Sequence, residues 1–365
     1  MQLKYIDEFR DPALARGVVG KIREAWGDRP PMRLMEVCGT HTVSIARAGI
    51  RPLLAGIVTM ISGPGCPVCV TPDGYIDAAI GLGKRPGTIL ATFGDMLRVP
   101  GRGSSLEKER GKGIDARVLY SPLDAVEIAA AHPDREVVFL GVGFETTAPS
   151  IAGAILSAAQ RRIPNFSVLS SVRTIPLAME VLASDPEVRI EGFLCPAHVS
   201  VIIGSDAYLP IAEKFGLPCV VAGFEPLDIL YGIYLLLRQK IRGAATVENE
   251  YSRAATPAGN RRALDVIARV FRPADIAWRG IGVLPGTGLR IADAFSAFDA
   301  EKKFGIEIPY AAEKTACRCG DVLKGTIAPP QCPLFGKACT PEAPYGPCMV
   351  SSEGTCAAYF KYGVQ

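Results

Sequence analysis

The sequence predicts an α/β protein: two related parallel-sheet α/β units around a central cleft, with a smaller cysteine-rich domain. Short apolar runs alternate with segments of helical period, which is typical of parallel sheets covered by helices. Two stretches, 136–156 and 217–237, share the order apolar strand, Gly-Phe-Glu, proline and apolar helix. Six of the eleven cysteines lie in the last 49 residues, among many prolines and glycines. We expect this tail, with N-terminal or helical segments, to form the smaller domain.

The regular elements can be placed in order along the chain. Asp11 and Pro12 provide a helix cap and a first helical position. One face of that first helix carries Leu14, Val18, Val19, Ile22 and Trp26. Strands are expected at 34–37, 56–61, 88–91, 117–120, 136–142, 166–170, 192–194 and 218–222. Helices are expected between most of them, such as 123–131 and 151–161, and the region 245–300 looks helical.

These elements suggest a division into four segments. A helical segment occupies residues 1–30, the first α/β domain 31–150 and the second 151–245. Residues 246–365 then form a helical linker and the cysteine-rich domain. The repeated pattern indicates duplication, although one recurring strand-to-helix turn would also produce it.

Composition excludes several classes of protein. The chain has 365 residues, 48% hydrophobic content and a formal charge of +3, without a long Lys/Arg run, so nucleic acid is not an expected partner. The most apolar helix candidate, 229–237, is far shorter than the roughly 20 residues of a membrane span. The chain opens without a basic and then apolar signal segment, so we expect a protein of the reducing cytoplasm.

The tail cysteines predict an iron-sulfur cluster, which four thiolates must reach from several directions. A zinc ribbon would need two close cysteine pairs, whereas the tail has one such pair and no histidine. Structural disulfides are the other alternative, and a reducing compartment disfavours them. The six candidates are Cys317, Cys319, Cys332, Cys339, Cys348 and Cys356.

Two cysteine motifs follow predicted strands, where open α/β sheets place their ligand sites. In the first, Cys38 lies near a helix start that favours a thiolate, and His41 is three residues further on. Inert core packing is the alternative for Cys38. In the second, Cys66 and Cys69 form a Cys-x-x-Cys with Pro67 inside it, which predicts a rigid loop rather than a helix. Such a pair suits a reversible disulfide or a metal, or is purely structural.

Two further strand ends carry Glu145, in the segment 143–149, and His198, in 195–200. A helix cap would explain the first residue and a satisfied buried histidine the second. Asp95 and Arg98 follow another strand in the segment 92–101. Together these residues predict a cleft that holds thiols, a carboxylate and imidazoles.

The motifs resemble one family closely over essentially the whole chain, the hydrogenase maturation (formation) protein HypD. The matching motifs are CGTHT, SGPGCPVCVTP, TFGDMLRVPG, GFETTAP, PAHVS, CRCGDVLKG, CPLFGKAC and GPCMVSSEGTCAAYF. The resemblance implies a role in building the Fe(CN)2CO unit of nickel-iron hydrogenases. It also implies a complex with the small chaperone HypC, cyanide delivered by HypE with HypF, and the hydrogenase large subunit as an indirect partner.

The resemblance also implies roles for individual residues. Cys38 would hold the assembling iron jointly with an N-terminal cysteine of HypC, supported by His41, and Cys66 and Cys69 would be redox-active and able to touch the iron. The ligands of a [4Fe-4S] cluster would be Cys317, Cys332, Cys339 and Cys356, with 14, 6 and 16 residues between them. Cys319 and Cys348 are then left over, although Cys319 lies close enough to replace Cys317.

The chemistry of the residues agrees with such a scaffold. A cluster supplies single electrons and a dithiol stores two, so the two sites together would make a redox relay beside an iron site. Glu145 and His198 would handle protons or hydrogen-bond the cyanide nitrogens. The alternatives are a stand-alone iron-sulfur-linked thiol-disulfide oxidoreductase, and a zinc-binding scaffold without redox chemistry.

Overall fold

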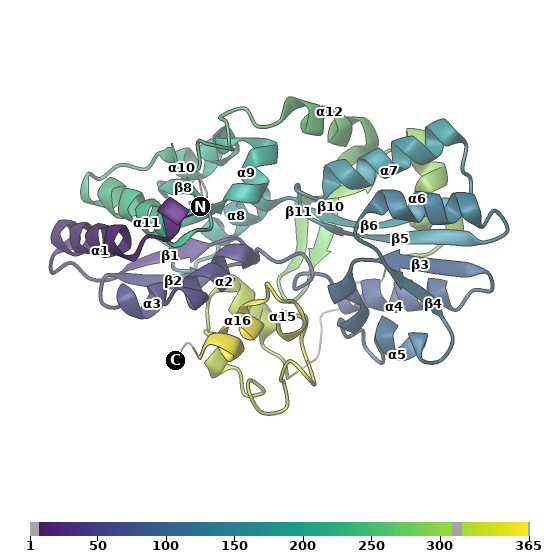
Figure 1. Ribbon diagram of the computed structural model, residues 1–365, viewed down its shortest axis with the longest axis horizontal. Helices are drawn as coiled ribbons and strands as arrows, with labels where there is room; N and C mark the ends of the chain where they lie inside the picture. Colours follow the sequence, from purple (N-terminus) through teal and green to yellow (C-terminus); the bar gives the residue numbers. More distant parts are fainter. Residues whose placement is uncertain (1–6, 309–315, 364–365) are drawn as a thin grey trace.

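The computed structural model describes residues 7–308 and 316–363, and these contain two separate β-sheets (Figure 1). One sheet has five strands, all parallel, in the order β2-β1-β7-β8-β9. Its strands are β1 (Met32–Glu36), β2 (Val58–Ser62), β7 (Gly192–Pro196), β8 (Cys219–Ala222) and β9 (Val247–Asn249). The prediction of an α/β protein with parallel sheets is confirmed.

The other sheet has six strands, in the order β10-β11-β6-β5-β3-β4. Four neighbouring strands are parallel, and β11 and β10 add an antiparallel hairpin at one edge. The strands are β3 (Thr88–Thr92), β4 (Asp115–Val118), β5 (Glu136–Gly143), β6 (Phe166–Arg173), β10 (Phe271–Trp278) and β11 (Gly282–Ile291). All eight strands expected from the sequence are therefore present, and the largest shift of an end is the extension of β6 to Arg173.

The division of the chain between the sheets differs from the expected segments. β1 and β2 belong to the five-stranded sheet, β3 to β6 to the other, β7 to β9 again to the first, and β10 and β11 to the second. The expected boundary at residue 150 falls between β5 and β6, which are paired neighbours. Short apolar runs identify strands but do not specify which strands pair, because parallel pairing requires long connections. The duplication of the two units stays a prediction.

The region 245–300 is not the helical linker that we expected. It contains β9, one α-helix of ten residues, α12 (Arg261–Val270), and the whole β10–β11 hairpin. The strands are joined by a tight turn with Gly280 at φ +69° and Gly282 at φ +131°, values that favour glycine. The hairpin has little alternation of its own, so the strong helical period of α12 dominates the sequence pattern of this region.

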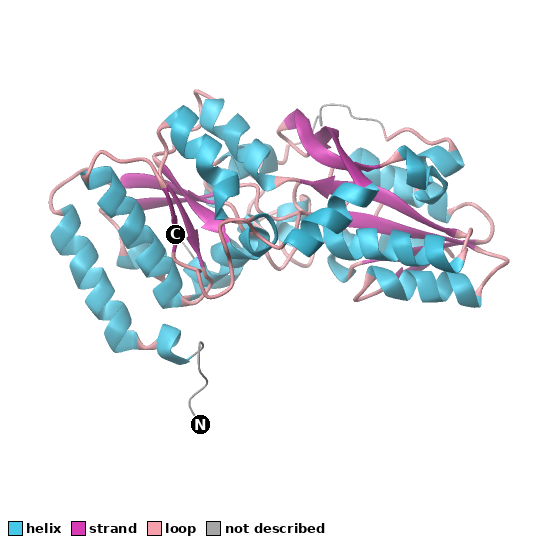
Figure 2. Ribbon diagram, turned by 90° about the horizontal axis from the view of Figure 1, so that it is seen from above, coloured by secondary structure: helices cyan, strands magenta, loops and turns pink. Residues whose placement is uncertain are grey.

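Helices cover both sheets (Figure 2). The helices are α1 (Pro12–Trp26), α2 (Gly39–Arg47), α3 (Ile50–Leu53), α4 (Asp73–Gly83), α5 (Leu106–Arg110), α6 (Pro122–Ala131), α7 (Ala148–Arg161), α8 (Ile175–Ser184), α9 (Ala197–Ile203), α10 (Leu209–Phe215), α11 (Pro226–Ile241) and α13 (Ala300–Phe304). Short 3-10 helices are η1 (Asp7–Arg10), η2 (Gly94–Arg98), η3 (Ser205–Tyr208) and η4 (Asp293–Phe298). No helix in the described ranges is both long and apolar enough to cross a membrane.

The first helix begins as its sequence predicts. The Asp11 side chain caps α1 by accepting hydrogen bonds from the backbone N–H groups of Ala13, at 2.6 Å, and Leu14. The apolar face is narrower than expected, because Leu14 is 54% exposed while Ile22 and Trp26 are buried. α1 packs on α11 at the outer side of the five-stranded sheet.

The C-terminal segment, residues 316–363, lies beside the five-stranded sheet between the two sheets' loops (Figure 1). It contains only short helices: α14 (Cys319–Lys324), η5 (Pro329–Gln331), α15 (Pro347–Val350) and α16 (Thr355–Tyr362). α16 packs on α2, and α14 packs on β2. The segment therefore covers the carboxyl edge of the five-stranded sheet.

One hydrophobic core joins these three parts. It contains residues that follow strands of both sheets, such as Val37, Phe144 and Ile175, and residues of the C-terminal segment. Its buried cysteines are Cys66, Cys69, Cys195, Cys219, Cys319 and Cys348. The strand-end loops of the two sheets thus meet in a shared apolar interior.

Candidate thiol and metal-binding site

Cys38 lies between the end of β1 and the start of α2, packed against the loop that carries Cys66. The Gly39 N–H donates a 3.0 Å hydrogen bond to the carbonyl oxygen of Gly65. A Cβ atom added at Gly65 would lie 2.2 Å from the Cys38 nitrogen, so only glycine allows this approach. The CGTHT and SGPGCPVC loops are therefore brought together, as the sequence predicted for neighbouring strand ends.

The Cys38 thiol is neutral in this environment. Burial, and then the negative charge of Glu353, raise the pKa of Cys38 to about 12, and the backbone N–H groups of His41 and Thr40 oppose this shift only in part. The N–H groups at the helix start favour the thiolate, as expected, but desolvation outweighs them. A bound cation would reverse this balance, since metals bind the deprotonated sulfur and release its proton.

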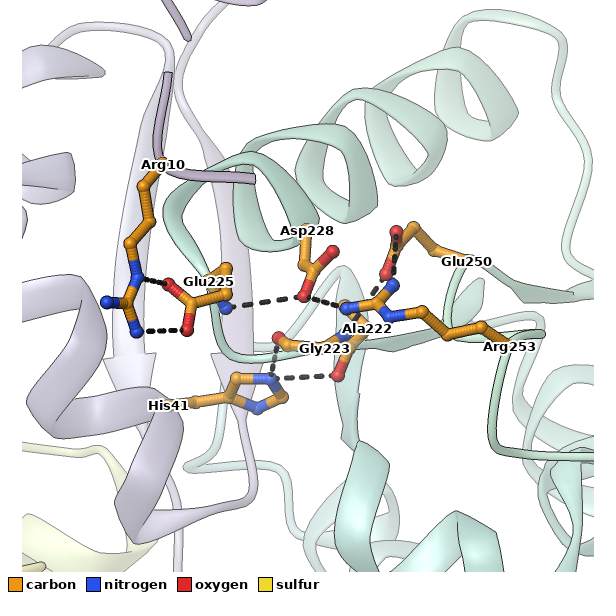
Figure 3. Close-up of polar contacts among 8 residues, drawn as sticks. All are labelled: Arg10, His41, Ala222, Gly223, Glu225, Asp228, Glu250 and Arg253. Carbon is orange, nitrogen blue, oxygen red and sulfur yellow. Dashed lines mark hydrogen bonds and ion pairs between the residues drawn. The ribbon is translucent and has the colours of Figure 1, made fainter. Parts of the chain in front are cut away.

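His41 is fully buried and has a defined tautomer (Figure 3). Its Nε2 lies 3.0 Å from the carbonyl oxygen of Ala222 and 2.8 Å from that of Gly223. Carbonyl oxygens only accept hydrogen bonds, so Nε2 carries the proton. Burial lowers the pKa of His41 to about 4, which keeps the ring neutral. Nδ1 is buried without a hydrogen-bond partner among the described residues, so its lone pair is available to a ligand.

His198 and His41 both contact one phenyl ring, that of Phe224. The ring centroid of Phe224 is 4.8 Å from that of His41 and 4.2 Å from that of His198. His198 is exposed, so the alternative interpretation, a buried core histidine with all its hydrogen bonds made, does not apply to this residue. The partial desolvation of its ring lowers the pKa of His198, and the Glu353 carboxylate opposes that shift. The ends of β1, β7 and β8 therefore bring both imidazoles and Cys38 to one edge of the sheet.

Cys66 and Cys69 form a disulfide in a buried turn, with their Cα atoms 5.3 Å apart. The Cys69 N–H donates to the Cys66 sulfur at 3.2 Å, and the Thr71 hydroxyl donates to the Pro67 carbonyl at 2.8 Å. The segment is a turn and not a helix, which confirms the prediction from Pro67. The Arg279 N–H donates to the Val70 carbonyl at 2.8 Å and so fixes the far end of the turn to the β10–β11 hairpin.

Glu145 contacts a different part of the shared core. Its Oε1 accepts a 2.8 Å hydrogen bond from the Ile175 N–H, and its Oε2 is buried without a partner in the described ranges. Burial raises the pKa of Glu145 to about 7. Its hydrogen bond thus goes to a strand end of the six-stranded sheet and not to Cys38 or either imidazole.

Two acidic residues of the site were missed from the sequence. Glu36 is fully buried and receives hydrogen bonds from the Thr42 hydroxyl, at 2.6 Å, and the Cys38 N–H, at 3.2 Å. Burial raises the pKa of Glu36 to about 7. Glu353 receives a 2.6 Å hydrogen bond from the Thr40 hydroxyl. An acid directly after the apolar pair Leu34 and Met35, and two residues before Cys38, was a usable signal for Glu36.

The tail cysteines converge on one pocket, lined also by Val322, Phe335 and Met349. Its six thiols belong to Cys317, Cys319, Cys332, Cys339, Cys348 and Cys356. The Tyr345 N–H donates to the Cys339 sulfur at 3.3 Å. A Cβ atom at Gly346 would lie 2.7 Å from the Cys317 sulfur, so the backbone leaves room for that thiol. Clustered thiols, an apolar wall and N–H donors to sulfur fit an iron-sulfur cluster.

The six thiols occupy different depths in that pocket. Cys319 and Cys348 belong to the shared core with Cys66 and Cys69, whereas Cys317 and Cys356 are only partly buried at its edge. A hydrogen bond to Cys319, and then burial, raise the pKa of Cys317. Within residues 7–308 and 316–363 no group of three His, Cys, Asp or Glu side chains is close enough to hold a single metal ion. The ligands of a cluster lie further apart than those of a single zinc ion, and the choice between the two stays a prediction for this pocket.

The remaining predicted residues, Asp95 and Arg98, connect the six-stranded sheet to the C-terminal segment. The Ser351 hydroxyl donates to Asp95 at 3.1 Å, and the Arg98 guanidinium donates to the Pro341 carbonyl. A polar cavity of about 820 Å³ lies beside Arg98. Its lining does not include Cys38, His41 or His198, so this cavity is separate from the thiol site.

The fold and its two groups of thiols define a class of α/β protein with cysteine sites in strand-end loops and in a C-terminal segment. Residues 13–363 match the HypD family model, described as the hydrogenase formation hypA family. The chain is 48% identical to a hydrogenase maturation factor HypD of Azotobacter vinelandii, over 100% of this chain and 98% of that protein. It is 42% identical to HypD of Escherichia coli strain K12, over 100% of this chain and 99% of that protein. The chain therefore belongs to the HypD family.

Proposed function

We propose that the chain is a hydrogenase maturation factor that holds iron on Cys38 while the Fe(CN)2CO unit is assembled. The observation that carries this proposal is the grouping of Cys38, His41, His198 and the Cys66–Cys69 turn at one sheet edge, beside a pocket of six thiols. The full-length match to relatives named hydrogenase maturation factors supports the same assignment.

In this proposal the iron is the substrate, and the Cys38 sulfur is its anchor. The neutral thiol loses its proton when Fe²⁺ binds, because the metal stabilises the thiolate that burial disfavours. His41 Nδ1, which has no hydrogen-bond partner among the described residues, would supply a lone pair to this site. His198 and the carboxyl group of Glu36, whose pKa burial raises to about 7, can hold protons near the site or donate hydrogen bonds to cyanide nitrogens. Glu145, which accepts its hydrogen bond from the Ile175 N–H, would hold a proton in the shared core instead.

The disulfide of Cys66 and Cys69 serves as a two-electron store next to the iron. Its reduction takes two electrons and two protons and produces two thiols, one of which adjoins the Gly65–Gly39 contact. The tail pocket would hold a [4Fe-4S] cluster through Cys317, Cys332, Cys339 and Cys356, and such a cluster supplies single electrons when bound. Cys319 and Cys348 share the apolar core with the disulfide.

Partner proteins follow from the family. We propose that a HypC-type chaperone contributes a second thiolate to the iron, that HypE with HypF delivers cyanide, and that the completed unit passes to the hydrogenase large subunit. The buried Cys38 and the exposed His198 at the same sheet edge agree with a site that a partner covers. We expect these steps to occur in the cytoplasm.

Complementation tests this function. A strain that lacks its own HypD would receive the wild-type chain, Cys38→Ala, or Cys195→Ala as a buried cysteine outside the site. The proposal expects hydrogenase activity with the wild-type chain and Cys195→Ala, and at least a hundredfold loss with Cys38→Ala. Full activity with Cys38→Ala would instead support a thiol-disulfide oxidoreductase that uses Cys66 and Cys69 alone.

A further inference from the structure

One peptide group links His41 to the carboxylate of Glu250, a residue without a role in the proposed iron site. The carbonyl of Ala222 and the N–H of Gly223 belong to the same planar amide. The carbonyl accepts from His41 Nε2 at 3.0 Å, and the N–H donates to Glu250 Oε2 at 3.0 Å (Figure 3). The amide therefore lies between the imidazole and the carboxylate, hydrogen-bonded at both ends.

We propose that Glu250 is a positioning residue for His41, and that it acts through the Ala222–Gly223 peptide. It holds the loop after β8 so that two carbonyl groups fix the Nε2–H tautomer and leave the Nδ1 lone pair free. The functional value of that lone pair rests on the proposed function, because only an iron site near Cys38 would use it. The positioning itself depends on contacts within the chain alone.

A second acid, Asp228, approaches the same loop closely because residue 223 is glycine. A Cβ atom there would lie 2.0 Å from Asp228 Oδ2, and a further 2.8 Å contact would be made with the Tyr251 ring. Asp228 also accepts from the Glu225 N–H at 3.3 Å. Two acidic side chains therefore hold the loop 222–225, Asp228 from α11 and Glu250, which follows β9.

A guanidinium fixes the two acids in turn. Arg253 Nη2 lies 2.6 Å from Asp228 Oδ2, and Nη1 lies 3.7 Å from Glu250 Oε1. The guanidinium stacks over the rings of Tyr251, at 4.3 Å, and Phe9, at 4.2 Å. Glu250 therefore has a fixed position, with one oxygen on the loop and the other toward Arg253.

The arrangement strengthens the hydrogen bond that selects the tautomer. An amide that donates its N–H to a carboxylate becomes more polarised, and its carbonyl becomes a better acceptor. The same loop carries Phe224, whose ring contacts both His41 and His198. Loss of the Glu250 contact would therefore weaken the tautomer preference and loosen the phenyl ring that contacts both imidazoles. Carboxylates that orient metal-binding histidines directly have the same effect.

The chain offers a simple spectrum for the test, because it has only three histidines, His41, His132 and His198. We would label histidine side chains with ¹⁵N and record the ring nitrogens in the chain alone, without iron or partners. The variants are Glu250→Met, which removes the acceptor at similar size, Glu250→Gln, which keeps an acceptor oxygen, and Glu248→Gln as a control on the same segment. His132 lies in the part of the chain that forms the six-stranded sheet, and its ring-nitrogen signals report whether a variant has folded.

Wild type, Glu248→Gln and Glu250→Gln should show a protonated Nε2 and an unprotonated Nδ1 for His41. In Glu250→Met the two His41 nitrogens should shift toward averaged positions, while His132 stays unchanged. Unchanged His41 signals in a folded Glu250→Met variant would overturn the inference. If Glu250→Met does not fold, the Nε2–H proton signal of His41 in Glu250→Gln decides: an upfield shift supports the inference, and no shift overturns it.

The failure of this inference is distinguishable from failure of the proposed function. A changed His41 tautomer together with full hydrogenase activity in the complementing strain would support the positioning role of Glu250 and contradict a role for His41 in iron handling.

Discussion

The Glu353 carboxylate accepts a 2.6 Å hydrogen bond from the Thr40 hydroxyl, two residues after Cys38. This contact joins the C-terminal segment to the loop that carries the proposed iron anchor. A Cβ atom added at Gly39 would lie 2.5 Å from the Cβ of Glu353, so the two segments touch at the backbone as well. The tail that holds the six thiols is therefore also a wall of the Cys38 site.

Removing the Glu353 charge should make Cys38 more reactive. Glu353 raises the pKa of Cys38, so Glu353→Gln lowers that pKa and increases the thiolate fraction at a given pH. We expect severalfold faster alkylation of Cys38, because one pKa unit corresponds to about a tenfold change in thiolate fraction. Mass spectrometry of the Cys38 peptide measures the rate, and Glu342→Gln, an exposed acid of the same segment, is the control. Equal rates in both variants would show that Glu353 does not act on the thiol.

A methyl group at residue 65 should disturb the contact between the two cysteine loops. Gly65→Ala places a Cβ atom 2.2 Å from the Cys38 nitrogen, so the backbone must move. We expect a loss of about 1–3 kcal/mol in the free energy of unfolding, as for other overpacked sites. Urea unfolding measures this free energy. The control is Gly81→Ala, where nothing lies within 4 Å of the added atom. A stability equal to that of the control would contradict the packing described for the Cys38 and Cys66 loops.

Glu145 should make stability depend on pH. Its pKa is about 7 in the folded chain, against an ordinary value of 4.5, so the folded state binds more protons between these values. The free energy of unfolding therefore falls as the pH rises through that interval. Glu145→Gln removes this effect. The free energy of unfolding of the variant should therefore rise, relative to that of wild type, by up to about 3 kcal/mol between about pH 4 and about pH 8.

Urea unfolding at several pH values measures this difference for Glu145→Gln, with Glu107→Gln, an exposed glutamate of α5, as the control. Parallel stability curves for wild type and Glu145→Gln would show that the Glu145 carboxyl ionises normally.

The tail cysteines should separate into two groups. Ser in place of Cys317, Cys332, Cys339 or Cys356 should abolish most of the visible absorption of a bound cluster and its acid-labile sulfide. Ser in place of Cys348, which lies deeper in the shared core, should leave both in place. Iron and sulfide analysis of anaerobically prepared protein measures this. Zinc without sulfide in the wild-type chain would contradict the cluster.

Much of the site could be predicted because the chain changes character where strands end. Cys38, Cys66, His198 and Glu145 each follow an apolar run, and the carboxyl ends of parallel strands are common ligand positions. The pairing of the strands was harder to predict from the sequence. Nothing local in the sequence shows that β1 lies between β2 and β7, since the whole of β3 to β6 separates β2 from β7 along the chain.

The acids of the site show the same limit. Glu36 and Glu250 depend on the folded backbone for their hydrogen bonds: the Thr42 hydroxyl and the Cys38 N–H donate to Glu36, and the Gly223 N–H, 27 residues away along the chain, donates to Glu250. In the local sequence pattern, both residues look like ordinary polar positions. The hairpin of β10 and β11 was missed because α12 before it has a much stronger period.

Infrared spectroscopy of the anaerobically purified chain tests the central claim most directly. The chain would be co-expressed with the proposed HypC-, HypE- and HypF-type partners, as wild type and as Cys38→Ala. We predict cyanide and carbonyl stretching bands in the wild-type sample and none in the variant. Bands of equal intensity in the variant, or no bands in either sample despite an intact cluster absorption, would contradict the assignment of Cys38 as the iron anchor.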